Sequence, residues 1–211
     1  AGKTEILECL FGLRQWDGGK MTLRGTELSR GHNARLAIDL GMALIPEDRA
    51  SQGMIGDDTV RANLSSVDMA KACHAGVFSR AKEDQLAQKL VDRLDVRPND
   101  IRYIMTGLSG GNQQKVVVGK WLTAEYPLYL MDEVTAGVDI EAKAEIYKII
   151  GQITQKGGAV LLATGDIEEA MGISDRIIVL YKGRIVYESS PAQTTKDDLL
   201  ARIMGGGTHA Q

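Results

Sequence analysis

The sequence predicts an α/β protein built on a mostly parallel sheet. Short, apolar segments at 128–131, 159–163 and 177–181 alternate with segments whose apolar residues recur at helical spacing. Strands that are apolar throughout are typical of parallel sheets covered by helices on both faces. The 24 glycines lie mostly between these segments, as expected of a protein with tight loops.

Each element follows from its local pattern. A helix is expected directly after Lys3, because Ile6, Leu7, Leu10 and Phe11 share one helical face. The remaining expected elements are, in order, a hairpin within 17–28, a helix capped by Asn33 and closed by Gly41, a strand at 42–45 stopped by Pro46, a helix over 79–96, a strand at 127–133, a helix over 140–155, a strand at 158–164, a helix over 166–172, strands at 176–181 and 183–188, and a helix near 195–204.

The strands disappear between about residues 57 and 105, where the apolar spacing is helical. We therefore expect a core formed by residues 1–56 and 106–204, a helical subdomain at 57–105, and a flexible tail at 205–211 that is rich in glycine.

Composition excludes several classes of function. A net charge of −3 and a pI near 5.7 argue against a general nucleic-acid binder. No apolar run approaches the roughly 20 residues that span a bilayer. Cys9 and Cys73 form no CxxC pair, which favours reduced thiols in a cytosolic protein.

Two acids end the strand at 127–133. Asp132 and Glu133 are expected at the carboxyl edge of the sheet, where ligands bind in open α/β folds. Asp132 is placed to hold Mg²⁺, and Glu133 to orient or deprotonate an attacking water. An isolated acid pair would more often end a strand before a loop, so this interpretation needs a second phosphate-binding feature.

Two helix starts supply such features. Gly2, Lys3 and Thr4 open a helix, whose free N–H groups suit a phosphate, while the lysine neutralises it and the hydroxyl ligates the metal. Ser109, Gly110 and Gly111 open another, where two glycines let the backbone approach a phosphate closely. An ordinary capped helix would explain the serine but not the paired glycines before Asn-Gln-Gln-Lys.

These motifs together resemble those of an ABC-transporter ATPase. The stretch LSGGNQQKVVVGKWL is similar to the ABC signature, MDEVTAGVDIEAKAEIY to its Walker B and D-loop, IPEDRASQGM to a Q-loop, and GISDRIIVLYKGRIV to the closing strands. The likeness runs from Ala1 to about Met204 and is greatest to the C-terminal nucleotide-binding half of the tandem ATPases that serve ribose, galactose or xylose importers. It implies a P-loop NTPase core of RecA-like fold with a helical subdomain.

The resemblance implies an ATPase that uses ATP and Mg²⁺. It assigns the β/γ-phosphates and Mg²⁺ to Gly2, Lys3 and Thr4, the metal also to Asp132, and the water-activating base to Glu133. ATP would lie between two halves in head-to-tail arrangement. Ser109, Gly110 and Gly111 would then reach the γ-phosphate on the partner half, with Asp139 in the D-loop between the sites.

The implied partners are a second nucleotide-binding half, membrane permease subunits and, indirectly, a periplasmic sugar-binding protein, with no nucleic acid. The permease would contact the chain near the Q-loop and residues 57–105. The implied place is the cytoplasmic face of the bacterial inner membrane, as a peripheral subunit that couples ATP hydrolysis to import of a monosaccharide or related solute.

Several positions depart from the family pattern. Glu47 stands where a Q-loop glutamine is expected, Val134 replaces the proline after the Walker B glutamate, and Asn112 replaces a glutamine in the signature. The switch position, normally a histidine that contacts the γ-phosphate, falls at Gly165. Removing a positioned polar group of this kind costs about 10²–10³ in rate, so we expect this site to bind ATP but turn over poorly.

The chain begins within the phosphate loop, so we expect it to be a fragment whose sheet lacks the preceding N-terminal strands. Two other interpretations stay open. A DNA-repair or translation ATPase of the same superfamily would carry a long coiled coil or basic linkers, and the sequence shows neither. A hydrolysis-deficient regulatory half is disfavoured by Lys3 and Glu133 and favoured by Glu47 and Gly165.

Overall fold

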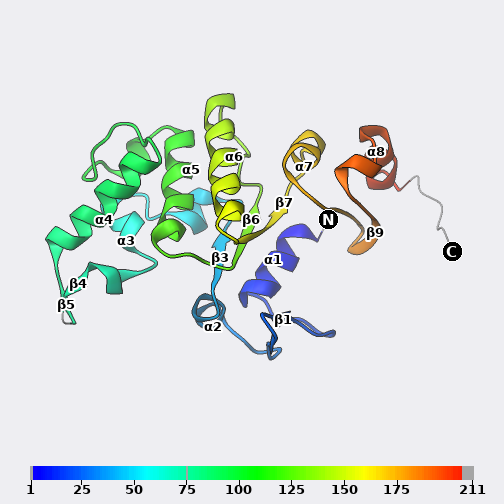
Figure 1. The fold of residues 1–211 in the computed structure, drawn as a ribbon, viewed down its shortest axis with the longest axis horizontal. Helices are drawn as coiled ribbons and strands as arrows, with labels where there is room; N and C mark the ends of the chain where they lie inside the picture. Colours follow the sequence, from blue (N-terminus) through cyan, green and yellow to red (C-terminus); the bar gives the residue numbers. More distant parts are fainter. Residues whose placement is uncertain (1, 75, 206–211) are drawn as a thin grey trace.

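A three-stranded parallel sheet forms the centre of the protein (Figure 1). In this computed structural model, which describes residues 2–74 and 76–205, β6 (Leu128–Asp132) lies between β3 (Met42–Ile45) and β7 (Ala159–Ala163). Both pairings are parallel, with Met42 opposite Leu128 and Leu128 opposite Ala159. The predicted α/β fold with helices around a parallel sheet is confirmed.

The other elements follow the predicted order. The helices are α1 (Lys3–Phe11), α2 (Ala34–Asp39), α3 (Val60–Ser65), α4 (Arg80–Arg93), α5 (Gly110–Gly119), α6 (Ile140–Gln155), α7 (Ile167–Ile173) and α8 (Lys196–Ile203). The remaining strands are β1 (Thr22–Leu23), β2 (Thr26–Glu27), β4 (Cys73–His74), β5 (Val77–Phe78), β8 (Ile177–Tyr181) and β9 (Arg184–Ser189). Short helical turns are η1 (Arg49–Gly53), η2 (Met69–Ala72), η3 (Met105–Gly107), η4 (Lys120–Thr123) and η5 (Pro191–Gln193).

The helices cover the sheet from two sides. In Figure 1, α1 and α2 lie below the central strands, and α5 and α6 lie above them. Helix α1 packs on β3 and β6, while α6 packs on β7 and on α5. Because α1 is fixed against β6, its first residues are held near the carboxyl end of that strand.

The last two strands differ from the expectation of one mostly parallel sheet. Strands β8 and β9 form a separate antiparallel hairpin. Its turn contains Lys182 and Gly183, both with positive φ (46° and 75°), which matches the twist that two-residue hairpins require. The apolar pattern predicts the two strands at 176–181 and 183–188, but it does not give their relative direction. That direction is set by the two-residue turn between them.

The segment 57–105 contains helices α3 and α4, but the expectation that it holds no strand is wrong. Strands β4 and β5 pair as a two-residue hairpin beside Gly76. Strands of two residues are too short to show a period-two pattern, which is why the sequence does not reveal them.

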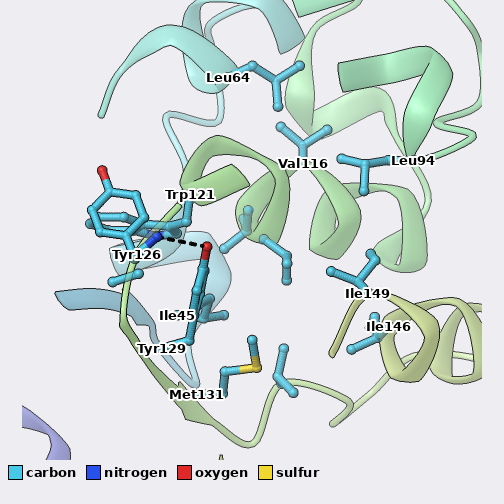
Figure 2. Packing of buried hydrophobic residues seen from close by; sticks show 14 of the residues in the cluster. Ile45, Leu64, Leu94, Val116, Trp121, Tyr126, Tyr129, Met131, Ile146 and Ile149 are labelled. Carbon is cyan, nitrogen blue, oxygen red and sulfur yellow. Dashed lines mark hydrogen bonds between the residues drawn. The ribbon is translucent and has the colours of Figure 1, made fainter. Parts of the chain in front are cut away.

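One apolar cluster includes residues of the central sheet, of the helices in segment 57–105 and of the helices that follow it in the chain. Figure 2 shows this packing, with contributions from Ile45, Leu64, Leu94, Val116, Trp121, Tyr126, Tyr129, Met131, Ile146 and Ile149. Trp121 and Tyr126 meet edge to face at 5.5 Å between ring centroids. Segment 57–105 therefore shares its core with the sheet, and a smaller second cluster forms around Ile177, Val179 and Leu199.

Two further predictions concern the C-terminal tail and the absence of a membrane-spanning segment. The tail expected at 205–211 lies, apart from Gly205, outside the described residues. Within the described part, no helix combines the length and apolarity needed to span a membrane.

Burial in the core predicts unequal effects for two isoleucines of α6. Ile146 is fully buried, whereas Ile140 is 87% exposed. Replacing Ile146 with Ala leaves a cavity and should lower the free energy of unfolding by about 2–5 kcal/mol. Ile140→Ala, the matched control, should change it by less than about 0.5 kcal/mol. Chemical denaturation measures both, and equal losses would contradict this packing.

Candidate active site

An ion pair joins the start of α1 to the end of β6. Helix α1 begins at Lys3, after Gly2 with a left-handed φ of 102°. The Lys3 Nζ lies 2.7 Å from Glu133 Oε1. Both side chains are partly exposed, so the pair contributes little stability by itself. Its consequence is geometric, because it places a cation and a carboxylate beside a helix N-terminus that favours anions.

The neighbouring Asp132 is a buried carboxylate with an unpaired oxygen. It is 2% exposed, and its Oδ1 has no hydrogen-bond partner within the described protein. Burial raises the pKa of Asp132; the Thr4 side chain acts against this, and the charges of Glu47 and Glu133 add to it. A buried carboxylate among other acids is a place where a cation would be stabilised.

The donors around Asp132 fit Mg²⁺. No group of three or more His, Cys, Asp or Glu side chains suited to a metal occurs within residues 2–74 and 76–205. Mg²⁺ does not need such a group, since it commonly binds one or two carboxylates and completes its shell with water and substrate phosphates. The Thr4 hydroxyl and the unpaired Asp132 oxygen are donors of this kind.

Glu133 is held in a strained backbone conformation. Its φ is 44°, which costs a non-glycine residue about 1–2 kcal/mol. The strain is offset by two backbone hydrogen bonds, each 2.8 Å. The Glu133 N–H donates to the Ala163 carbonyl of β7, and the Glu133 carbonyl accepts from the Ala136 N–H. These bonds fix the point from which the Glu133 side chain leaves the sheet.

Gly165, the predicted switch position, lies beside the ion pair. A Cβ added to Gly165 would be 3.4 Å from Glu133 Oε1 and 3.8 Å from Lys3 Nζ. Both are ordinary contact distances, so a methyl group at this position would contact the pair without collision. The structure therefore places Gly165 beside the Lys3–Glu133 pair, where it offers no polar group.

Glu47 lines a cavity of about 380 Å³ that opens next to Thr4 and Asp132. The walls also include three polar residues that the sequence analysis did not single out, Glu8, Gln52 and Lys120. Burial lowers the pKa of Lys120 to about 8, and its ammonium donates to the Gly53 carbonyl. Lys120 is partly buried because η1 packs on α5. This contact joins segments that are far apart in the sequence, so no local pattern predicts it.

We call Lys3, Thr4, Glu47, Asp132, Glu133 and Gly165 the Lys3 group. Gly2 completes it through its backbone at the start of α1. The structure thus brings seven of the predicted site residues to one edge of the sheet.

The other four predicted residues, Ser109, Gly110, Gly111 and Asp139, form the Ser109 group. Ser109 is exposed and caps α5 by accepting from the Asn112 N–H. Asp139 caps α6 in the same way, at 2.8 Å from the Ala142 N–H. A Cβ on Gly111 would lie 3.4 Å from Asp139 Oδ2, so the starts of α5 and α6 are in close contact.

Arg49 is a neighbour of the Ser109 group that the sequence did not indicate. Its guanidinium donates to Gln113 Oε1 at 3.3 Å and lies 2.8 Å from the position of a Cβ on Gly110. Within the described part of the chain, the atoms nearest to a Cβ on Gly110 or Gly111 all belong to residues outside the Lys3 group. The predicted residues therefore fall into two groups.

The fold and the order of its motifs are those of the P-loop class of α/β domains: a parallel strand ending in two acids lies beside a Gly-Lys-Thr helix start. The family model described as ABC transporter matches residues 1–136, more than half of the chain. The chain belongs to the ABC transporter family.

Curated relatives agree with this assignment. Ribose import ATP-binding protein RbsA 2 of Streptomyces coelicolor is 38% identical over 95% of this chain, and RbsA of Corynebacterium glutamicum is 39% identical over 95%. RbsA of Chromobacterium violaceum is 36% identical over the whole chain. The chain spans 39%, 38% and 42% of the respective relatives, so it corresponds to about two fifths of their length.

Solved structures share the fold. A dimeric post-hydrolysis state of the ATP-binding cassette MJ0796, bound to ADP and Pi, superposes with a TM-score of 0.77 over 90% of this chain and 81% of that one, at 20% identity. The ADP conformation of MJ1267, an ATP-binding cassette of an ABC transporter, gives 0.71 over 96% and 80%, at 17% identity.

The glycines of the Ser109 group should differ in their tolerance of a methyl group. A Cβ on Gly111 would lie 2.7 Å from the Ala142 Cβ, which is fixed on α6. Gly111→Ala should therefore lower the free energy of unfolding by about 1–3 kcal/mol. In Gly110→Ala the methyl group comes too close only to the movable end of Arg49, and it lies at an ordinary 3.7 Å from the Gly137 carbonyl, so this variant should be near neutral in thermal or chemical unfolding. An equal loss in both variants would contradict the packing of α5 against α6.

Proposed function

We propose that this chain is the ATP-binding and ATP-hydrolysing part of an ABC importer for a monosaccharide or a related small solute. The membership of the family and the ribose-import names of the relatives support the class of transport. The observation that carries the enzymatic part is the Lys3–Glu133 pair at 2.7 Å, next to the buried and unpaired oxygen of Asp132.

The Lys3 group suits binding of the β- and γ-phosphates of ATP. The N–H groups at the start of α1 and the Lys3 ammonium would neutralise them. Thr4 and Asp132 would hold Mg²⁺, which supplies positive charge and orients the phosphates when bound. Glu47, at the edge of the adjoining cavity, would face the metal or the γ-phosphate as an acceptor.

Glu133 would accept the proton of the attacking water. The water oxygen forms a bond to the γ-phosphorus, the bond from that phosphorus to the β–γ bridging oxygen breaks, and its electron pair stays on ADP. In this structure the Glu133 carboxylate is paired with Lys3. A phosphate that draws Lys3 away would release the carboxylate, so binding would prepare the base.

The Ser109 group would serve a second nucleotide-binding half. Ser109 is exposed at the start of a ten-residue helix, where its hydroxyl bonds Asn112 of the same helix turn. In a head-to-tail pair, Ser109, Gly110 and Gly111 would approach the γ-phosphate bound by the partner, with Asp139 between the sites. The further partners are membrane permease subunits and, through them, a periplasmic sugar-binding protein.

The proposed place of action is the cytoplasmic face of the bacterial inner membrane, because ATP is supplied there and the permease crosses the bilayer. Both nucleotide-binding halves would belong to one polypeptide, in which this chain is the C-terminal half. The length of the relatives, of which this chain spans about two fifths, is consistent with that arrangement.

A second candidate function is a half that binds ATP, hydrolyses it poorly and completes the partner's site. Gly165 favours this alternative, because it lies beside Glu133 without a side chain that could contact the γ-phosphate. The charge of Glu47, where an amide would be neutral, favours it as well.

An asymmetric mutation test separates the two halves. In the intact importer, we expect this site to hydrolyse ATP more slowly than the site of the other nucleotide-binding half. Glu133→Gln should abolish hydrolysis at this site, yet it should reduce transport less than the matching glutamate change in the other, N-terminal half. ATP binding should be retained, because Glu133 is not needed for phosphate binding. An equal or larger loss of transport from Glu133→Gln would refute the proposal that this half hydrolyses ATP poorly.

A rescue experiment addresses the cause of the asymmetry. Gly165→His should raise single-turnover hydrolysis at this site, whereas Gly165→Ala, whose methyl group fits the same space, should not. Equal rates for both variants and the wild type would show that the missing histidine does not limit turnover.

A further inference from the structure

A buried hydrogen bond links the two segments that border the Lys3–Glu133 pair. The Thr135 hydroxyl donates to Glu169 Oε1 at 2.7 Å. Thr135 is 3% exposed and Glu169 is 4% exposed, so this contact is shielded from water. Neither residue belongs to the predicted site.

The Glu169 carboxylate is costly in this place. It takes part in no ion pair among the described residues, and its Oε2 has no hydrogen-bond partner there. Tyr147 lies close by: burial raises the Tyr147 pKa to about 12, and the charge of Glu169 and a side-chain hydrogen bond with Glu169 add to that rise. An apolar side chain would fill such a position at lower cost, so packing alone does not explain Glu169.

The position of the bond along the chain shows what it connects. Thr135 lies in the turn that the Ala136 N–H closes onto the Glu133 carbonyl, directly after the strained Glu133. Glu169 lies in the first turn of α7, where Asp166 accepts its N–H, and Asp166 follows Gly165. The bond therefore ties the Glu133 turn to the Gly165 segment.

A second link to the Gly165 segment comes from α6 and is exposed. Lys143 of α6 lies 3.2 Å from the Asp166 carboxylate. Exposed pairs of this kind contribute little and weaken with salt. The Thr135–Glu169 bond is the shielded link, and it spans 34 positions of the sequence.

We propose that Glu169 is a positioning residue for Glu133, acting through Thr135. Once a phosphate draws Lys3 away from Glu133, Gly165 offers no side chain to hold the Glu133 carboxylate, so its orientation then depends on the backbone turn. The Thr135–Glu169 bond keeps that turn in its left-handed conformation and the Gly165 segment beside it. This inference rests on the proposed ATPase function of the Lys3 group.

The test removes one hydroxyl without changing the shape of the side chain. Thr135→Val is made in the assembled transporter ATPase, with the partner half's catalytic glutamate replaced by glutamine so that only this site is measured. The turnover number should fall roughly tenfold or more, since a shift of about 1 Å at a reacting group can cost about 10² in rate. The KM for ATP should stay within about twofold, because phosphate binding does not use Glu133.

Two conservative variants separate positioning from general damage. Thr135→Ser keeps the hydroxyl and should restore turnover to within about twofold of the wild type. Glu169→Gln keeps an acceptor for Thr135 and removes the buried charge, so it should retain turnover and raise the melting temperature. If Thr135→Val fails to fold, the Ser and Gln variants are compared with Glu169→Leu, which removes the acceptor.

The outcomes distinguish this inference from the proposed function. Wild-type turnover in Thr135→Val, or a raised KM with unchanged turnover, would overturn the positioning role. Unchanged hydrolysis in Glu133→Gln alone would instead overturn the assignment of Glu133 as the base.

Discussion

The structure depends on the meeting of a helix start and a strand end at one edge of a parallel sheet. Helix α1 packs on β3 and β6, and this places Lys3 2.7 Å from Glu133, although the two residues are 130 positions apart. The strained backbone of Glu133 is stabilised by its bond to β7. The start of α1 and the end of β6 therefore both require the sheet, and neither would keep its geometry as an isolated segment.

The second constraint is the separation of the Ser109 group from the Lys3 group. Close packing requires a glycine at position 111, since a Cβ there would overlap Ala142. This packing fixes the start of α5 against the start of α6, with Ser109 exposed. A helix N-terminus held rigidly at the surface is suited to an anion brought by another protein surface, which is why the proposed mechanism needs two halves.

The sequence predicts those parts of the fold and site that depend on local patterns. The strands β3, β6 and β7, helix α6 at 140–155 and the cap at Asn33 follow from apolar spacing and capping residues. The hairpin β4–β5 and the separate β8–β9 sheet do not, because they depend on short turns. Arg49, Lys120 and Glu169 are not indicated by the sequence for another reason: their contacts are made between segments far apart in the chain, which no local pattern records.

The central claim is that ATP is bound between two halves, by the Lys3 group of one and the Ser109 group of the other. A cryo-EM structure of the assembled transporter ATPase with ATP and Mg²⁺, trapped by Glu133→Gln, tests it directly. We expect Lys3 to contact the phosphates and no longer the residue at position 133, while Ser109 faces the nucleotide bound by the opposite half. A nucleotide-loaded structure in which Ser109 faces solvent, or the Lys3 of its own chain, would contradict this arrangement.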